Sequence, residues 1–298
     1  MQVFHKIKAF LKAHLAARIL LGVVIVLTVL CIALHPQGTK TFLVLGMDNY
    51  GSLNESSRND VTMLVQVDFS KSKISAVTFA RDMFINNENG NPIKINTVLR
   101  NNRNEQDLCS LIEKNFGIPV DGWFRVNFTS VIELVEAIGG AEVELTSAEV
   151  NYLLQKGMGV YEENPLQEGK SRLNGAQALA YARCRKLDND LGRGERQGKL
   201  IAAMVRQTKH LTVARIVNVF NSLKHAWRSS YSVVDQSKLL LQALWLRGAK
   251  VEHIAVPFEG EWRYGNAGSV SGVIAKLDEN KLLLLEALGR PIPDAAEQ

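Results

Sequence analysis

Cysteine is scarce in this 298-residue chain. Its three cysteines, Cys31, Cys109 and Cys184, are too few for a disulfide scaffold, and no CxxC or Cys/His spacing of a zinc site occurs. Cys31 lies in an apolar N-terminal run. We expect Cys109 and Cys184 to be buried free thiols, with pairing in an oxidising compartment as the alternative.

Several well-known catalytic motifs are also missing. The chain has no Walker A loop, no GxGxxG and no GxSxG, and no histidine stands in the spacing of a triad or a metal site. The four tryptophans are scattered and do not form a base-stacking platform. The net charge of +5 is modest, so we predict no nucleic-acid partner; phosphate-bearing lipids suit such a charge equally well.

One long uncharged run is present near the N-terminus, from Ile19 to Leu34. These sixteen residues span about 24 Å as a helix, and the preceding Leu15–Ala17 extend the run to about 20 residues if Arg18 snorkels. Lysines precede the run, so the positive-inside rule places the N-terminus in the cytoplasm and the chain after residue 36 outside.

Two other readings of this run fit less well. A cleaved signal peptide needs small residues at its cleavage site, which Cys31-Ile32-Ala33 does not provide, and a lipoprotein needs a small residue where Leu30 stands. We therefore predict a cytoplasmic tail (1–18), a single-pass transmembrane anchor (19–35) and an extracytoplasmic catalytic domain (36–298) in the cell membrane.

The remaining chain alternates between strand-like and helix-like segments. This alternation predicts an α/β (α+β) domain with a mixed central sheet flanked by helices. We expect strands at 41–46, 62–68, 74–80, 123–128, 141–145 and 251–256. We expect helices at 105–116, 129–138, 174–183, 194–210, 213–227, 235–246 and 278–288.

Two aspartates lie at the ends of predicted strands. Asp48 follows the first strand and Asp60 precedes the second, and the strand-end loops of α/β sheets are common ligand sites. Two carboxylates of this kind suit Mg²⁺ together with phosphate oxygens. Turn formation or helix capping explains two loop aspartates equally well.

Arginines cluster at two other places. Arg81-Asp82 follows the third strand, while Arg183 and Arg185 end one helix and Arg193, Arg196 and Gln197 begin the next. Arginines near a helix N-terminus oppose the helix dipole unless an anion binds there. The cluster is either a clamp for phosphate or pyrophosphate, or a solvated basic face.

Seven segments resemble, in order, the motifs of the LytR–CpsA–Psr (LCP) family. They are FLVLGMDNYG (42–51), SRNDVTMLVQVD (57–68), FARDMF (79–84), KIN (94–96), VIELVEAIGGAEVEL (131–145), LNGAQALAYARCR (173–185) and DNDLGRGERQ (188–197). They spread over about 150 residues. The resemblance implies an LCP-type α/β/α domain behind one membrane anchor.

The resemblance also implies a Mg²⁺-dependent phosphotransferase, with Mn²⁺ as an alternative to Mg²⁺. Such an enzyme moves a glycopolymer with one phosphate from a polyprenyl-pyrophosphate lipid to a peptidoglycan hydroxyl and releases polyprenyl phosphate. Asp48 and Asp60 match the metal-associated and catalytic aspartates of the family, and Arg81 matches both a catalytic and a pyrophosphate-binding position. The other pyrophosphate-binding positions are matched by Arg58, Lys94, Arg183, Arg185, Arg193, Arg196 and Gln197.

Two departures from the family pattern and three alternative functions remain. Ala80 stands where the family often has proline, and Val61 separates Asp60 from Thr62. A hydrolase of the same lipid or a non-catalytic lipid-binding protein would use the same charged residues. A DNA-binding regulator is disfavoured, because the predicted cytoplasmic tail is only about 18 residues long.

Overall fold

The computed structural model describes residues 36–51, 53, 59–100, 103–158, 165–184, 187, 190–246 and 248–292. Residues 38–298 form one compact unit. Within the described ranges no helix combines the length and apolar character needed to cross a membrane. The predicted anchor at 19–35 lies outside them, as do Arg58 and Arg185.

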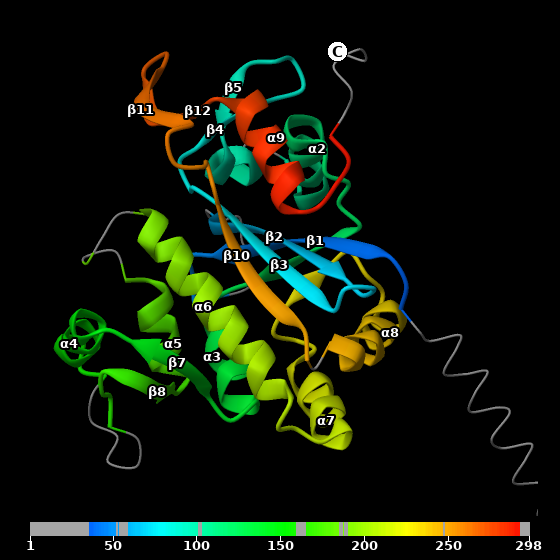
Figure 1. Ribbon diagram of the computed structural model, residues 1–298, viewed down its shortest axis with the longest axis vertical. Helices are drawn as coiled ribbons and strands as arrows, with labels where there is room; N and C mark the ends of the chain where they lie inside the picture. Colours follow the sequence, from blue (N-terminus) through cyan, green and yellow to red (C-terminus); the bar gives the residue numbers. More distant parts are fainter. Residues whose placement is uncertain are drawn as a thin grey trace, which may run out of the picture. The chain divides into compact units, whose positions relative to one another are not determined.

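A six-stranded mixed sheet runs through the middle of this unit, as predicted (Figure 1). Its strand order is β10-β3-β2-β1-β6-β9; β1 pairs antiparallel with β2 and parallel with β6, while β3 pairs antiparallel with β2 and parallel with β10. The strands are β1 (Thr39–Met47), β2 (Asn59–Asp68), β3 (Lys73–Phe79), β6 (Gly122–Val126), β9 (Arg228–Ser229) and β10 (Lys250–Val256).

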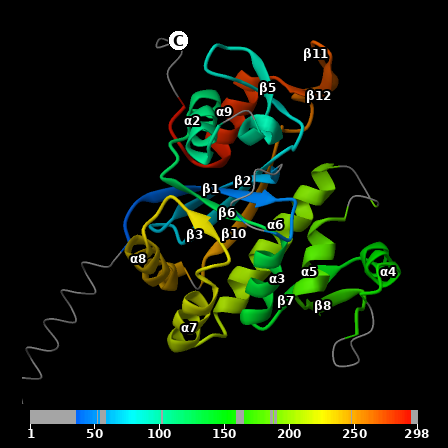
Figure 2. The same cartoon turned by 180° about the vertical axis from the view of Figure 1, so that it is seen from behind.

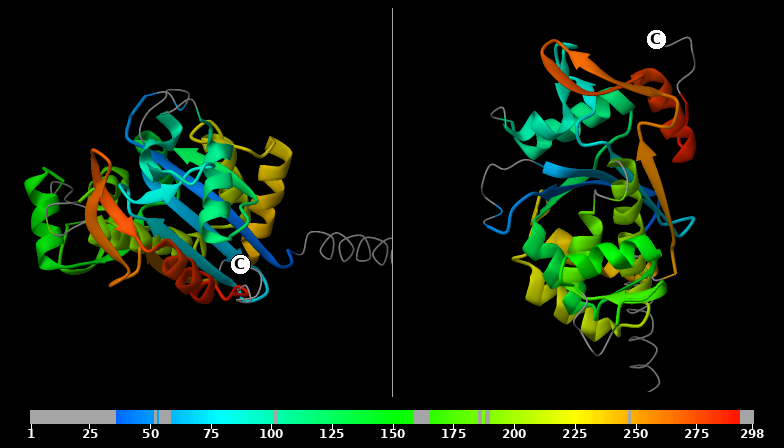
Figure 3. Two further views of the ribbon diagram at one scale, coloured as in Figure 1. Left: turned by 90° about the horizontal axis from the view of Figure 1, so that it is seen from above. Right: turned by 90° about the vertical axis from the view of Figure 1, so that its left-hand side faces the viewer.

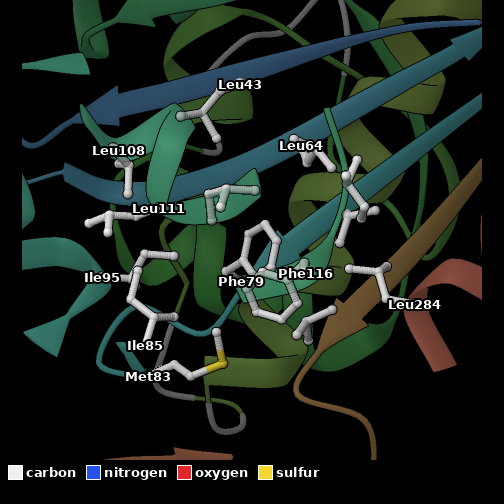
Figure 4. Packing of buried hydrophobic residues seen from close by; sticks show 14 of the residues in the cluster. Leu43, Leu64, Phe79, Met83, Ile85, Ile95, Leu108, Leu111, Phe116 and Leu284 are labelled. Atoms are coloured by element: carbon white, nitrogen blue, oxygen red, sulfur yellow. The ribbon is translucent and has the colours of Figure 1, made fainter. Parts of the chain in front are cut away.

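Helices α2 (Glu105–Phe116) and α9 (Leu277–Ala287) cover one face of the sheet (Figures 1 and 2). Alternation along β1 sends Leu43 and Leu45 into this face, where they pack with Phe79, Phe116 and Leu284 (Figure 4). Around these helices lie η1 (Ile95–Arg100), β4 (Phe84–Asn86), β5 (Pro92–Lys94), β11 (Trp262–Ala267) and β12 (Val270–Ala275).

The opposite face is covered by α3 (Phe128–Ala137), α6 (Asp190–Thr208), α7 (Val213–Leu223) and α8 (Val233–Ala243), which η2 (Leu244–Leu246) continues (Figure 3). Beyond α3 and α6, a second apolar cluster joins them to β7 (Ala141–Leu145), α4 (Ser147–Gln155), β8 (Gly169–Leu173) and α5 (Gly175–Ala182). The sheet is therefore enclosed by helices on both faces, and its strand ends remain available for a site.

Most element boundaries agree with the local signals in the sequence. Helix α2 ends at Gly117, which adopts φ 67°, and the Asn174 capping box begins α5. Two predicted helix starts were wrong. Asn127, with Ser130 three residues on, caps α3 in place of Thr129 or Ser130, and α6 begins at Asp190 rather than at residue 194.

Helix α6 approaches the sheet closely through two glycines. Gly194 faces Thr78 of β3, and Gly198 faces the ring of His253 on β10. The His253 Nε2 lies 3.1 Å from the Thr78 hydroxyl oxygen. This close packing sets the position of the α6 N-terminal turns relative to the ends of the strands.

Candidate functional site at the strand ends

Sheet topology brings the predicted aspartates and the first arginine to one edge. Met47 is paired with Asn59, and Thr62 is paired with Phe79, so the end of β1, the start of β2 and the end of β3 are neighbours. Asp48, Asp60 and Arg81 are each within two residues of those strand ends. The antiparallel order therefore gathers residues that stand 33 positions apart in the chain.

An ion pair joins two of these side chains. Arg81 Nη1 donates to Asp60 Oδ1 at 3.0 Å, and both side chains are mostly buried. The Arg193 guanidinium lies over the same strand start, with Nη2 3.5 Å from the Asp60 carbonyl oxygen. Helix α6 thus brings a second, buried guanidinium to Asp60.

Asp48 has a looser partner from α5. Arg183 Nη2 lies 3.6 Å from Asp48 Oδ1, with both side chains nearly half exposed, and the Arg183 guanidinium rests 4.0 Å from the centre of the Phe128 ring. An exposed pair of this length contributes at most about 1 kcal/mol, so Arg183 can turn toward an anion at little cost. The stacking on Phe128 keeps its planar group beside Asp48.

The loop that carries Asp48 is tied to the start of α3. The main-chain N–H of Phe128 donates to the Asn49 carbonyl at 3.1 Å, and Asn127 Nδ2 donates to the Gly51 carbonyl at 2.7 Å. Asn127 also caps α3, so one residue holds both the helix and the loop. The sequence analysis missed Asn127 and Phe128, although the Asn127–Ser130 spacing is a recognisable capping signal.

We call Asp48, Asp60, Arg81, Arg183 and Arg193 the strand-end site. Two further predicted residues border it on α6. Arg196 is turned into the domain: its Nη2 donates to the Cys184 carbonyl at 2.8 Å, and its Nη1 lies 3.6 Å from Glu149 Oε1 of α4. Gln197 Nε2 lies 3.4 Å from the Ala182 carbonyl. These contacts hold α6 against the end of α5.

Lys94 lies at the end of β5, beside the main chain that follows Arg81. Its ammonium is 5.7 Å from the centre of the Phe84 ring. A Cβ added at Gly272 would lie 2.5 Å from the Asp82 carbonyl oxygen and 2.9 Å from Lys94 Cε. Lys94 is therefore next to the Arg81-Asp82 turn, and Tyr264 of β11 reaches Asp82 Oδ2 at 3.3 Å.

The donor set for a metal consists of two carboxylates. In the part of the chain that the structure describes, no three His, Cys, Asp or Glu side chains are grouped to hold an ion. Asp48 and Asp60 supply the one or two protein carboxylates with which Mg²⁺ is commonly bound, together with substrate phosphate oxygens and water. Each carboxylate already faces an arginine, so the site holds both charge signs that a metal–phosphate complex needs.

Burial controls the protonation of groups around the site. Desolvation lowers the pKa of His253, which packs against α6 just behind Arg193 and Gln197, below its usual 6.5. Burial raises the pKa of Tyr152, whose neighbours Arg183 and Arg196 counter that effect. Cys109 and Cys184 are buried free thiols, as predicted, and burial raises the pKa of Cys109 to about 12.

An apolar cavity of about 250 Å³ lies between the sheet and helices α7 and α8. Phe42 and Phe124 line it from β1 and β6, and Leu239 and Leu240 line it from α8. Val135 of α3 and Leu200 and Ala203 of α6 are instead buried in the cluster with β7, β8, α4 and α5.

These features define an α/β domain with guanidinium and carboxylate groups at one edge of a mixed sheet and a partly open apolar cavity between the sheet and helices α7 and α8. A sequence model of the LytR_cpsA_psr family matches residues 24–281. The chain belongs to this family.

Two curated relatives illustrate the similarity. The chain is 29% identical over 173 residues to the polyisoprenyl-teichoic acid–peptidoglycan teichoic acid transferase TagT of Bacillus subtilis. This match covers 57% of this chain and 53% of the relative. It is 27% identical over 249 residues to the regulatory protein MsrR of Staphylococcus aureus, covering 82% of this chain and 72% of the relative. The chain spans about half the length of the first curated relatives it matches, TagV and TagT.

Solved structures of TagT share the fold. TagT bound to LIIa-WTA superposes with a TM-score of 0.67 at 25% identity, covering 85% of this chain and 91% of that one. TagT with bound octaprenyl pyrophosphate lipid gives a TM-score of 0.63 at 23% identity, covering 85% and 91%. The mixed sheet flanked by helices is therefore the fold of this family.

Proposed function

We propose that this chain transfers a glycopolymer, together with one phosphate, from a polyprenyl-pyrophosphate carrier to a hydroxyl group of peptidoglycan. The observation that carries the proposal is the strand-end site, where three arginines from different elements converge on two aspartates. The relatives include teichoic acid transferases, and one neighbouring structure holds octaprenyl pyrophosphate. We also propose that the catalytic domain is extracytoplasmic and that residues 19–35 anchor it in the membrane.

In the proposed reaction the acceptor hydroxyl oxygen attacks the glycan-side phosphorus. A new P–O bond forms to peptidoglycan, the bond to the bridging oxygen breaks, and polyprenyl phosphate leaves. The hydroxyl proton passes to a nearby base or to water. Positioning and charge stabilisation dominate such transfers, which is the chemistry that arginine side chains supply.

The position of each arginine indicates which part of the pyrophosphate it would contact. Arg81 and Arg193 lie beside Asp60 and would contact the pyrophosphate oxygens there, while Arg183 can reach the same anion from the Asp48 side. Arg58, Arg185 and Lys94 are proposed as further pyrophosphate contacts. Arg196 and Gln197, also predicted to bind pyrophosphate, border the strand-end site; we propose that Arg196, through its buried contacts, positions α6.

Asp48 and Asp60 would hold Mg²⁺, or Mn²⁺ in its place. The ion would supply positive charge that neutralises the departing phosphate. Removing either carboxylate also removes the ion pair that it forms with its arginine, so the two variants change both the proposed metal site and the arginine clamp.

The apolar cavity is the proposed place for part of the prenyl tail. Phe42 lies five residues before Met47 on β1, so the cavity is about 17 Å along the strand from the strand-end site. A lipid whose pyrophosphate binds at the site would run its tail under β1 toward the cavity. The aromatic lining of the cavity suits such an apolar tail.

The test uses the full chain in detergent with a synthetic polyprenyl-pyrophosphate glycan, Mg²⁺ and peptidoglycan oligomers. Mass spectrometry should detect a Mg²⁺-dependent glycan–phosphate–peptidoglycan product, which Asp60→Ala and Arg81→Ala abolish. Arg215→Ala removes one exposed positive charge on α7 and serves as the matched control. Polyprenyl phosphate without the product would indicate a hydrolase, and binding without turnover would indicate a lipid-binding protein.

A further inference from the structure

Helix α8 carries an exposed apolar face. None of its residues is buried, and Val234 and Leu241 are 78% and 38% exposed. Lys238 lies between them at i+4 from Val234, so the three share one side of the helix. Trp245, 48% exposed, follows in η2. We call Val234, Lys238, Leu241 and Trp245 the α8 face.

The composition of the α8 face is that of a helix lying in a bilayer interface. Aliphatic side chains can enter the acyl region, a lysine can reach the headgroups, and tryptophan favours the boundary between them. Val213 and Val233, which are 47% and 62% exposed, add apolar surface at the starts of α7 and α8. Large apolar side chains exposed on one side of a helix favour an interaction site. The one acidic side chain of α8, Asp235, is held by Ser232 at the first turn.

The inner side of the same helix lines the apolar cavity. Leu239, Leu240 and Ala243 face the cavity, and Leu246 of η2 closes it beside Phe69. The cavity is partly open. One thin element, α8 with η2, therefore separates an apolar interior from the surface that carries the α8 face.

The chain also enters the domain at this side. The Phe69 N–H donates to the Gly38 carbonyl at 3.1 Å, so the start of β1 lies next to a residue of the cavity wall. Leu246 of η2, which continues α8, lies in one apolar cluster with Phe42 of β1 and Phe69. Four residue steps separate residue 35 from Thr39, which spans at most about 14 Å. If the proposed anchor ends at residue 35, this short connection would keep the start of β1 near the membrane surface.

We propose that the α8 face docks on the phospholipid bilayer, so that the polyprenyl tail passes between the membrane and the apolar cavity beside α8. The inference rests on the proposed function for its lipid substrate and on the proposed anchor for its geometry. It adds a second membrane contact to the anchor, and it places the strand-end site at the far end of β1 from the membrane.

The first experiment measures whether Trp245 touches lipid. The full chain is reconstituted into phosphatidylcholine/phosphatidylglycerol vesicles containing lipids brominated near the headgroup, and tryptophan fluorescence quenching is recorded. Trp245→Phe should remove a large share of the quenching. Trp262→Phe, which alters a residue packed against the apolar cluster on the α2 and α9 face of the sheet, should leave the quenching unchanged. Equal quenching in the parent and in Trp245→Phe overturns the proposal. Protection of Trp245 from the brominated lipids by a second copy of the chain also overturns it.

The second experiment separates docking from chemistry. Val234→Asp and Leu241→Asp should lower turnover of a long-chain polyprenyl substrate in vesicles and leave turnover of a short-chain, water-soluble analogue unchanged. Equal loss on both substrates overturns the role of the α8 face. A parent without turnover on either substrate refutes the proposed function, while the quenching result still decides whether the face docks.

Discussion

Replacing Gly198 by alanine tests how closely α6 must approach the sheet. A Cβ there would lie 2.4 Å from Cγ and 2.5 Å from Cδ2 of the His253 ring, far inside the usual 3.5–4.0 Å between carbon atoms. The ring cannot move easily, since its Nε2 lies 3.1 Å from the Thr78 hydroxyl. Gly194 is the matched control, because a Cβ there would make ordinary contacts of 3.5 Å or more.

Both substitutions gain helix propensity, but only Gly198→Ala overpacks the contact between α6 and the sheet. Each gains about 1 kcal/mol of helix propensity, and overpacking costs roughly 1–3 kcal/mol, which Gly198→Ala incurs near the upper end. We therefore expect Gly198→Ala to destabilise the domain by about 2 kcal/mol and Gly194→Ala to stabilise it by about 1 kcal/mol. At about 2–4 °C per kcal/mol for a domain of this size, Tm falls by about 6 °C in the first variant and rises by about 3 °C in the second.

Urea unfolding and thermal melts followed by circular dichroism measure both values. In a His253→Ala background the ring is absent, so Gly198→Ala should lose its penalty and become neutral or stabilising. Turnover should also fall in Gly198→Ala below its Tm, since Gln197 and Arg193 lie on the displaced turns of α6. A Gly198→Ala variant as stable as Gly194→Ala would refute the packing argument.

Four further predictions concern the site and buried groups of the domain. Arg81→Lys keeps the charge but loses the planar, bidentate guanidinium group, so turnover should fall by about 10²–10³-fold. Asp60→Asn should raise the Mg²⁺ concentration needed for activity. Unchanged kinetics in either variant would exclude the proposed role of that residue. Burial lowers the pKa of His253 in the folded protein below its unfolded value of 6.5. The folded state therefore favours the neutral ring, and the resulting stability is present above pH 6.5 and is lost as the pH falls. Between pH 7.5 and 5.5 the urea midpoint should therefore drop more in the parent than in His253→Gln. In a Cys31→Ser background, Cys109, with its pKa raised to about 12, should react with a thiol reagent at pH 8 only after unfolding; labelling of the folded protein would contradict its burial.

Local signals predicted much of the fold. The β2–β3 hairpin follows from two apolar runs around a polar turn, and α2 follows from helical spacing that ends at Gly117. The β11–β12 hairpin escaped prediction because few of its residues are buried, and glycine and polar residues interrupt its apolar ones. Strand β8 also escaped, because it is recognised only through its pairing with β7, about 28 residues earlier in the chain.

By itself, the sequence determined the family motifs, the two aspartates at strand ends and the arginines near α5 and α6. These are local facts, because a strand end or a helix start is encoded within a few residues. Tertiary structure decided which groups meet: antiparallel pairing joined Asp60 to Arg81, whereas Arg196 turned inward to Glu149, 47 positions earlier. Tertiary structure also decided where the cavity lies. An apolar helix face has the same sequence pattern whether it packs in a core, lines a cavity or faces outward. That choice depends on how helices such as α3 and α8 are seated on the sheet, which only the folded chain specifies.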